Sequence, residues 1–177
     1  MKRSLSYFIV FVVACGVAAA QQAKTTAKAP AAAAPPAGPA HIVMAPPEIK
    51  WGDPPPVFEK GMSFAVLSGD PGKAGLYVVR GKMPAGYKIA PHWHPTDEHV
   101  TVLSGNFAFG MGEKFDKASM KTLPAGGYAL MPADMRHFAM ATTAAVIQVH
   151  GQGPFALTYV NPADDPSKRA PAAPAKK

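Results

Sequence analysis

The chain is almost free of cysteine, since Cys15 is the only one in 177 residues. Without a second cysteine the chain cannot form an internal disulfide, although an exported protein could hold one. Beyond residue 15 there is also no thiolate metal ligand and no cysteine nucleophile. The zinc-finger and thiol-enzyme classes are therefore excluded, and any metal site must use imidazole and carboxylate donors.

Long amphipathic helices are missing as well. Short β-rich runs instead alternate with turn residues about every eight to twelve positions, a spacing typical of an all-β sandwich or barrel. Residues 115–121 are expected to form a turn or loop. The predicted strands cover residues 64–67, 76–82, 87–94, 99–103, 106–111, 128–131, 137–141, 145–150 and 155–160.

The folded part of the chain has no excess of positive charge. The formal net charge is +7, but residues 41–166 carry ten Lys and Arg against eleven Asp and Glu. No run of Lys and Arg is interleaved with aromatic residues, so we expect no nucleic-acid partner. The remaining cations lie near the two ends: Lys2, Arg3, Lys24, Lys28, Lys168, Arg169, Lys176 and Lys177.

Residues 1–20 have the features of a signal peptide. A charged start (Lys2 and Arg3) precedes a short apolar stretch over residues 5–13 and a small-residue cleavage site before Gln21. This predicts a secreted protein, either periplasmic or extracellular. Residues 12–15 resemble a bacterial lipoprotein box, so the alternative is a lipid anchor on Cys15 and a membrane-anchored lipoprotein.

Composition divides the rest of the chain into four parts. Residues 21–40 are rich in Ala and Pro and are expected to be a disordered linker, and residues 167–177 a disordered basic tail. Residues 61–166 must form the single folded domain. Residues 41–60 are rich in proline and predict an irregular arm, which either runs along the barrel or reaches a neighbouring subunit of a homodimer.

Three histidines and one glutamate form the pattern with the clearest chemical meaning. His92 and His94 are two positions apart in a predicted strand, so their side chains point to the same face. Glu98 can return to that site from the next strand, and His137 from a distant one. Nitrogen and oxygen donors of this kind suit Fe, Mn, Zn, Ni or Cu better than Ca or Mg, and the four residues are our predicted metal ligands.

The spacing around these residues resembles the cupin superfamily. Gly86-x5-His92-x-His94-x3-Glu98-x6-Gly105 is similar to the first cupin signature at every defined position. The resemblance covers roughly residues 60 to 160. It implies a single-domain double-stranded β-helix, the RmlC-like jelly-roll barrel, with one divalent metal at the site; Fe or Mn is favoured, with Zn, Ni and Cu as alternatives.

The second signature is matched with two departures. Gly126-x5-Pro132-x-Asp134-x2-His137-x3-Ala141 has Asp134 where the superfamily usually has Gly, and Ala141 where it often has Asn. Neither position is a metal ligand in the superfamily. The departures therefore concern turn geometry more than metal binding.

The resemblance implies dioxygenase-, isomerase-, decarboxylase- or lyase-like chemistry on a small organic molecule. The rival hypotheses are a non-catalytic protein that uses the metal to bind or sense a small molecule, and a structural metal site. For an enzyme, Glu98 and His150 are the predicted proton-transferring residues. His150 lines the pocket only if Gln148 and His150 face inward; otherwise Ile147 and Val149 face the core.

Overall fold

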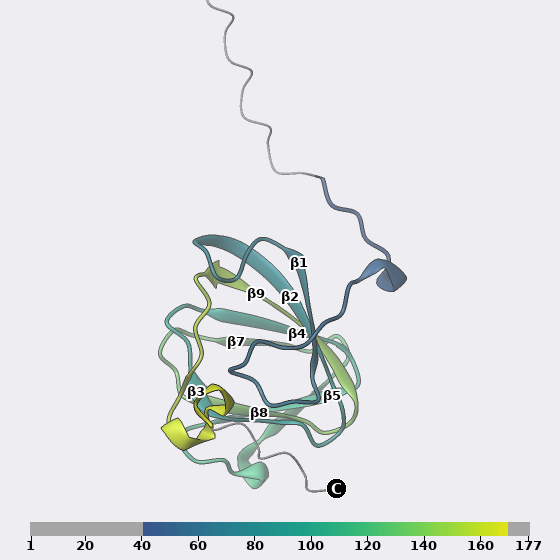
Figure 1. Cartoon of the computed structure of the whole chain (residues 1–177). Coiled ribbons are helices and arrows are strands. Elements are labelled where there is room, and N and C mark those ends of the chain that lie inside the picture. Colours follow the sequence, from purple (N-terminus) through teal and green to yellow (C-terminus); the bar gives the residue numbers. More distant parts are fainter. Residues whose placement is uncertain (1–40, 170–177) are drawn as a thin grey trace, which may run out of the picture. The chain divides into compact units, whose positions relative to one another are not determined.

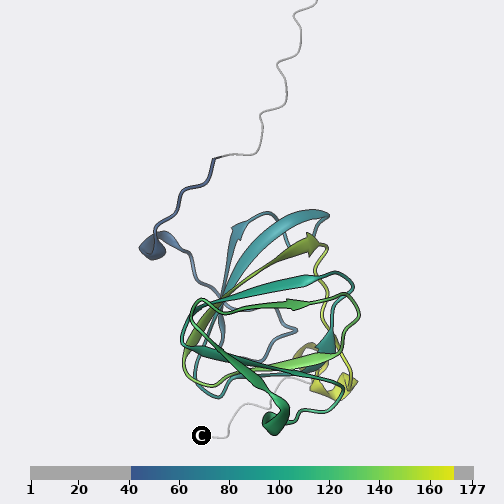
Figure 2. The same ribbon diagram turned by 180° about the vertical axis from the view of Figure 1, so that it is seen from behind.

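Two five-stranded antiparallel sheets face each other and enclose the interior of the domain (Figures 1 and 2). The computed structural model describes residues 41–169. The strand order is β1-β2-β9-β4-β7 in one sheet and β10-β3-β8-β5-β6 in the other. The predicted all-β jelly-roll barrel is confirmed.

The strands of the first sheet are β1 (Ser63–Ser68), β2 (Gly75–Met83), β4 (Glu98–Ser104), β7 (Tyr128–Met131) and β9 (Ala145–Gly153). Those of the second sheet are β3 (Lys88–Trp93), β5 (Asn106–Met111), β6 (Lys121–Pro124), β8 (His137–Ala141) and β10 (Thr158–Tyr159). Four short 3₁₀ helices complete the described part: η1 (Pro46–Glu48), η2 (Lys117–Ser119), η3 (Pro162–Asp164) and η4 (Pro166–Lys168).

Each predicted strand overlaps an observed one, but two regions differ from expectation. The expected strand over residues 155–160 narrows to β10, which pairs with β3. The edge strand β6 was not expected, because its side chains are mostly exposed and show no clear apolar alternation. Pairing with β5, a tertiary interaction, makes it a strand.

Alternation along the strands separates the core from the outer surface. In β9 the buried Ile147 and Val149 alternate with the half-buried Gln148 and His150. The inner residues of β2, β4 and β9 pack with those of β5 and β8 into one hydrophobic core. A period of two therefore determines which side chains can reach the interior of the barrel.

Glycines of the two sequence signatures occupy turns that favour glycine. Gly86, Gly105 and Gly126 have φ values of 82°, 70° and 86°. A Cβ atom on Gly105 would lie only 2.0 Å from the carbonyl oxygen of Ala144. Any side chain at this position would thus displace the backbone that leads into β9.

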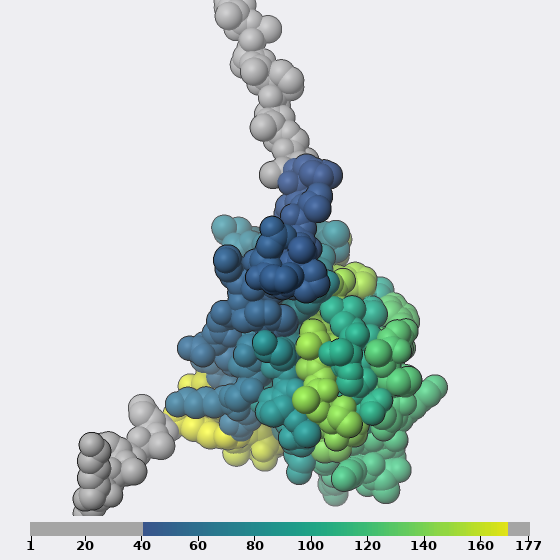
Figure 3. Space-filling model, turned by 90° about the vertical axis from the view of Figure 1, so that its right-hand side faces the viewer, coloured from purple at the N-terminus to yellow at the C-terminus, as the bar shows by residue number. Residues whose placement is uncertain are grey.

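The proline-rich arm packs against the barrel (Figure 3). Gly52 forms a bridge with Phe64 of β1. The hydroxyl of Tyr159 donates to the carbonyl of Val57 at 2.9 Å. The arm therefore runs along the barrel, the first of the two paths considered from sequence.

Several predictions fall on residues outside the described range. The signal peptide, the alternative lipid anchor at Cys15 and the linker lie in residues 1–40, and most of the predicted basic tail lies in residues 170–177. The first residues of that tail are described: η4 extends to Lys168, and Arg169 forms a salt bridge with Glu59. No helix within residues 41–169 is long and apolar enough to cross a membrane.

Candidate metal centre

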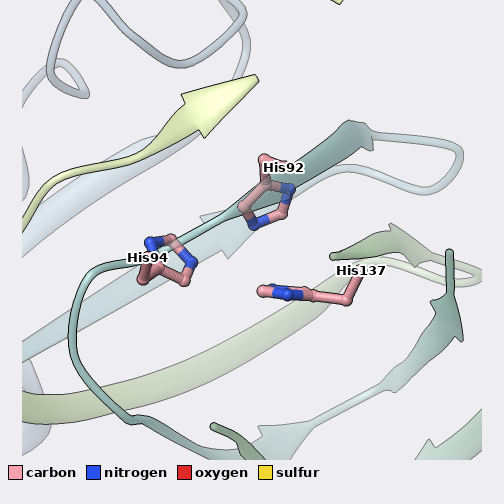
Figure 4. A group of neighbouring side chains, drawn as sticks. All are labelled: His92, His94 and His137. Carbon is pink, nitrogen blue, oxygen red and sulfur yellow. The ribbon is translucent and has the colours of Figure 1, made fainter. Parts of the chain in front are cut away.

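His92, His94 and His137 converge inside the barrel (Figure 4). His92 in β3 and His137 at the start of β8 are direct cross-strand partners, and their ring centroids are 4.2 Å apart. His94 follows the last residue of β3. One ligand atom from each of the three rings can be chosen so that all lie within 4.8 Å of one another, and all three side chains are buried.

The backbone fixes the tautomer of each ring. Each Nδ1 lies within hydrogen-bond distance of a carbonyl oxygen, which can only accept, so Nδ1 carries the proton and Nε2 of the neutral ring keeps its lone pair. The acceptors are Ala90 for His92 (2.7 Å), Ala156 for His94 (2.8 Å) and Met135 for His137 (3.0 Å). Three lone pairs are thus available for a common ligand.

One of these nitrogens has no partner. Nε2 of His94 is buried and makes no hydrogen bond within residues 41–169. An unsatisfied buried polar atom costs about 1–3 kcal/mol, so native structures rarely retain one without a reason. A divalent transition metal fits this nitrogen, because imidazole Nε2 is a common ligand of such ions.

Glu98 brings a carboxylate to the same place from the opposite sheet. It is the first residue of β4, and its Oε2 lies 3.6 Å from Nε2 of His94 and 3.6 Å from Nε2 of His137. These separations are too long for good hydrogen bonds. They lie within the span of about 4.2 Å that two donors, each about 2.1 Å from one ion, can bridge.

For His92 and Glu98 the electrostatics of the site favour the protonation states that bind a cation, whereas for His94 they favour the protonated ring. Burial, with the neighbouring imidazoles, lowers the pKa of His92 to about 3, so this ring is neutral at pH 7. Burial disfavours the charge on Glu98, but His137 and His94 outweigh it and hold the pKa of Glu98 well below its usual range. Burial likewise lowers the pKa of His94, but the Glu98 carboxylate overcomes this effect and raises it. His94 must be neutral to bind a metal, so metal binding would release a proton from this ring wherever it is protonated.

The two loops that carry the ligands are tied to each other. The backbone N–H of Asp134 donates to the carbonyl of His94 at 2.8 Å. The N–H of Ala133 donates to Oδ1 of Asp97 at 2.8 Å. These bonds join the corner before Glu98 to the turn before His137. Asp134, which stands where the superfamily usually has Gly, has a φ of 62°, in the left-handed region that favours glycine.

A narrow apolar pocket adjoins the site. Its volume is about 70 Å³, and Glu98 contributes the one charged side chain of its lining. A second cavity of about 30 Å³ touches His92, His137 and Glu98. The larger pocket is lined by Pro55, Phe58, Met62, Phe64, Pro71, Tyr77, Val79, Gly81, Ile89, Glu98, Ile147, Val149 and Phe155.

The structure corrects the predicted pocket position of His150. Because Ile147 and Val149 point into the core, the alternating His150 lies on the outer face of the sheet. Its ring stacks on that of His99, with centroids 4.9 Å apart and planes 9° apart. His99 follows Glu98 in β4 and therefore points away from the metal ligands, which agrees with this arrangement.

Tyr77, Phe58 and Phe155 were not singled out as pocket residues from the sequence. Tyr77 alternates with Val79 on the inner face of β2, a pattern that predicts burial but not proximity to Glu98. Phe58 lies in the irregular arm, where no periodicity assigns a side chain to a face. Phe155 lies 5.0 Å from His94 between ring centroids, and only the tertiary structure reveals this contact.

The two antiparallel sheets enclose three imidazoles and a carboxylate, and the two sequence signatures lie at strand ends. These features define a cupin barrel. Comparison with family models agrees. The model described as ChrR cupin-like domain matches residues 39–156, and the chain belongs to this family. Comparison with curated proteins finds no match.

Solved structures show the same fold at low sequence identity. The polyketide cyclase RemF from Streptomyces resistomycificus is 15% identical, with 73% of this chain and 92% of that chain covered and a TM-score of 0.60. A candidate acetylacetone dioxygenase from Methylibium petroleiphilum is 22% identical, with coverages of 72% and 85% and a TM-score of 0.55. An RmlC-like cupin from Shewanella frigidimarina is 17% identical, with coverages of 64% and 91% and a TM-score of 0.51.

Proposed function

We propose that His92, His94, Glu98 and His137 hold one divalent transition metal. The observation that carries this proposal is the set of three Nδ1–carbonyl contacts, which leave three Nε2 lone pairs in one buried cluster. Glu98 adds one negative charge beside them. Fe or Mn is our first choice, with Zn, Ni and Cu as alternatives.

We propose further that the metal-loaded protein acts on a small organic molecule, with dioxygenase-, isomerase- or lyase-like chemistry. The pocket beside Glu98 supports this idea, because an apolar cavity with few polar groups is typical of small-molecule sites. Two fold neighbours, a polyketide cyclase and a candidate acetylacetone dioxygenase, are consistent with it. A bound metal would supply Lewis-acid or redox chemistry.

Glu98 is the residue to which we assign proton transfer. It lines the pocket and contacts the imidazole cluster, so it can face both a substrate and the metal. Burial around the carboxylate excludes water, which strengthens its interaction with a nearby cation. The role once expected of His150 has no geometric support.

Non-catalytic binding or sensing of a small molecule is the second candidate. The observation that favours it is the outer position of His150, which stacks on His99. The imidazoles that line the two cavities are His92 and His137, and both are assigned to the metal. Neither cavity therefore has a histidine left over for proton transfer within the described chain. Turnover separates the two candidates. A binding protein would retain its ligand unchanged, whereas an enzyme would release a product.

Elemental analysis of protein purified from its native compartment tests the metal proposal. We expect about one transition metal per chain. The metal-loaded protein is then screened against phenolic, thiol and sugar substrates, and we expect oxygen uptake or product formation with at least one of them. Metal content near zero under conditions that load other cupins would refute the proposal. Stoichiometric metal with ligand binding but no turnover would favour the second candidate.

Export remains part of the proposal. The first 20 residues predict a signal peptide, and Cys15 offers the lipidated alternative. Mass spectrometry of the mature protein should find Gln21 or an acylated Cys15 at the N-terminus. Soluble protein that retains Met1 would contradict both forms.

A further inference from the structure

Three inward-facing positions form a row across the first sheet. Tyr77 of β2 pairs with Gly151 of β9, and Gly151 in turn pairs with Glu98 of β4. Neighbouring residues of one row point to the same face of a sheet. The residue between the tyrosine and the glutamate therefore has no side chain, and its neighbours take the space that a side chain would fill: a Cβ atom there would lie 2.9 Å from the carbonyl oxygen of Asp97.

The ring of Tyr77 uses this space. A Cβ atom on Gly151 would lie 3.0 Å from Oη of Tyr77 and 3.4 Å from its Cζ. The end of the tyrosine side chain thus lies over the glycine, displaced along the row toward Glu98. The ring of Phe155 packs edge-on against it, with centroids 5.9 Å apart, and holds it in this position.

The Tyr77 hydroxyl differs from those of the other two buried tyrosines. The hydroxyls of Tyr87 and Tyr159 donate to backbone carbonyls of the arm, at 2.6 Å and 2.9 Å. The hydroxyl of Tyr77 donates to no backbone carbonyl within residues 41–169, although its side chain is only 1% exposed and lines the pocket. Burial, and then the nearby charge of Glu98, raise the pKa of Tyr77, so the group stays a protonated donor.

The remaining pocket wall restricts what can bind beside this donor. No Lys or Arg is among the lining residues of the two cavities within the described chain, so the proposed metal is the one positive charge that they would offer a ligand. A cavity of about 150 Å³ holds benzene. At about 70 Å³, the larger pocket has room for roughly three or four heavy atoms by that standard.

We propose that Tyr77 is a substrate-binding residue whose hydroxyl donates a hydrogen bond to a carbonyl or hydroxyl oxygen of a small, uncharged, mainly apolar molecule. This inference rests on the proposed function, because it assigns the substrate class of the same site. The apolar body occupies the space between Ile147, Val149 and Phe155. Its oxygen lies at the Tyr77 hydroxyl, on the pocket wall that Tyr77 shares with Glu98.

The test uses the full chain loaded with Mn²⁺ and two probes of matched size, acetone and acetate. Mn²⁺ content and affinity are measured first. Paramagnetic broadening of each probe's methyl proton signal then gives its affinity for the site. We expect acetone to bind, and Tyr77→Phe to weaken it about tenfold while Mn²⁺ affinity stays within twofold, since one hydrogen bond is lost and no ligand is removed.

Tyr128→Phe is the matched control, because it removes a hydroxyl from the outer face and should change neither affinity. Failure of the wild type to bind Mn²⁺ or any other transition metal would refute the proposed function itself. Normal metal binding with no measurable binding of acetone, or an acetate affinity that Tyr77→Phe lowers as much as the acetone affinity, would overturn the inference about substrate class. An equal loss of metal and acetone affinity in Tyr77→Phe would show a structural role and overturn the assignment of Tyr77.

Discussion

The barrel contains two groups of histidines that are close in sequence but chemically different. His92, His94 and His137 lie inside, with each Nδ1 held by a backbone carbonyl. His99 and His150 lie outside as a stacked pair, and Nδ1 of His99 contacts the hydroxyl of Tyr128 at 2.7 Å. A hydroxyl can donate or accept, so it does not fix the tautomer of His99 as a carbonyl would.

The difference shows that proximity of imidazoles does not by itself make a metal site. The inner rings are buried, point their Nε2 atoms toward one another and have a carboxylate beside them. The outer pair is only partly buried, and its rings are parallel. The residues that hold the rings, more than the number of rings, distinguish the two groups.

Removal of an inner ring should have the largest effect. We expect His92→Ala and His137→Ala each to weaken metal binding by at least about 100-fold, because a ligand is lost and the others are left poorly oriented. Elemental analysis after dialysis, with a competitive chelator titration, measures the change.

The outer pair supplies the controls for this experiment. His99→Ala and His150→Phe should leave metal content near that of the wild type, and His150→Phe should also leave turnover or ligand affinity unchanged. Full metal occupancy in the double variant of His92 and His137 would eliminate the proposed site. A 100-fold loss of activity in His150→Phe would restore the catalytic role that the geometry removes.

Acid should destabilise the metal-free protein through the inner group. The pKa of His92 is lowered to about 3 from an ordinary value of 6.5, so the stability gained from its neutral form is complete above pH 6.5 and is lost toward pH 3. The pKa of His94 is raised, so its contribution stays constant below pH 6.5. Glu98 adds a further loss below about pH 4.5. We expect the free energy of unfolding to fall by up to about 2 kcal/mol between pH 6.5 and 5.

Urea unfolding of the metal-free protein at several pH values measures this slope. His92→Gln should flatten it between pH 6.5 and 5, since the replacement does not titrate. His99→Gln keeps the inner rings and should retain the slope. Identical slopes for the wild type and His92→Gln would show that His92 is not the group responsible.

The contrast between the two groups also marks how far the sequence could predict the structure. Strand periodicity and the two signatures identified the barrel and brought His92, His94, Glu98 and His137 into one hypothesis. Alternation also indicated that His150 shares a face with Gln148. It could not decide which face is inside, because Ile147 and Val149 are good core residues and Gln148 and His150 could equally have lined a polar pocket.

Other features depend on register, which the sequence does not reveal. Tyr77 approaches Glu98 because β9 places Gly151 between them. The contact of Asp97 with Ala133 joins segments 36 positions apart. The residues could be assigned to strands and loops from local patterns, but their partners are determined by long-range pairing.

The link between the two ligand loops should have a moderate effect. Asp97→Ala removes the acceptor of the Ala133 N–H and should weaken metal binding about tenfold, as loss of a residue that orients metal ligands commonly does. Asp97→Asn is the matched control, because its amide oxygen can accept the same bond and should keep affinity within about threefold. Equal affinity in Asp97→Ala and the wild type, by chelator competition, would show that the link does not support the inner group.

The smallest effect is expected at Asp134, where this chain departs from the usual glycine of the second signature. The residue has φ of 62°, a conformation that Asp tolerates better than most side chains. Asp134→Gly removes the steric cost of a side chain at positive φ, which stabilises the folded state. It also raises the conformational entropy of the unfolded chain, which destabilises the fold by a similar amount. The free energy of unfolding should therefore change by less than about 1 kcal/mol. The N–H that donates to His94 is kept, so metal affinity should not change.

Asp134→Val is the contrasting variant, because a β-branched residue is strained at positive φ. It should lower the free energy of unfolding by about 1–3 kcal/mol and also lower the metal affinity. Thermal unfolding and metal titration of both variants test this expectation, and a Val variant as stable as the wild type would show that the turn does not impose its geometry on the inner histidines.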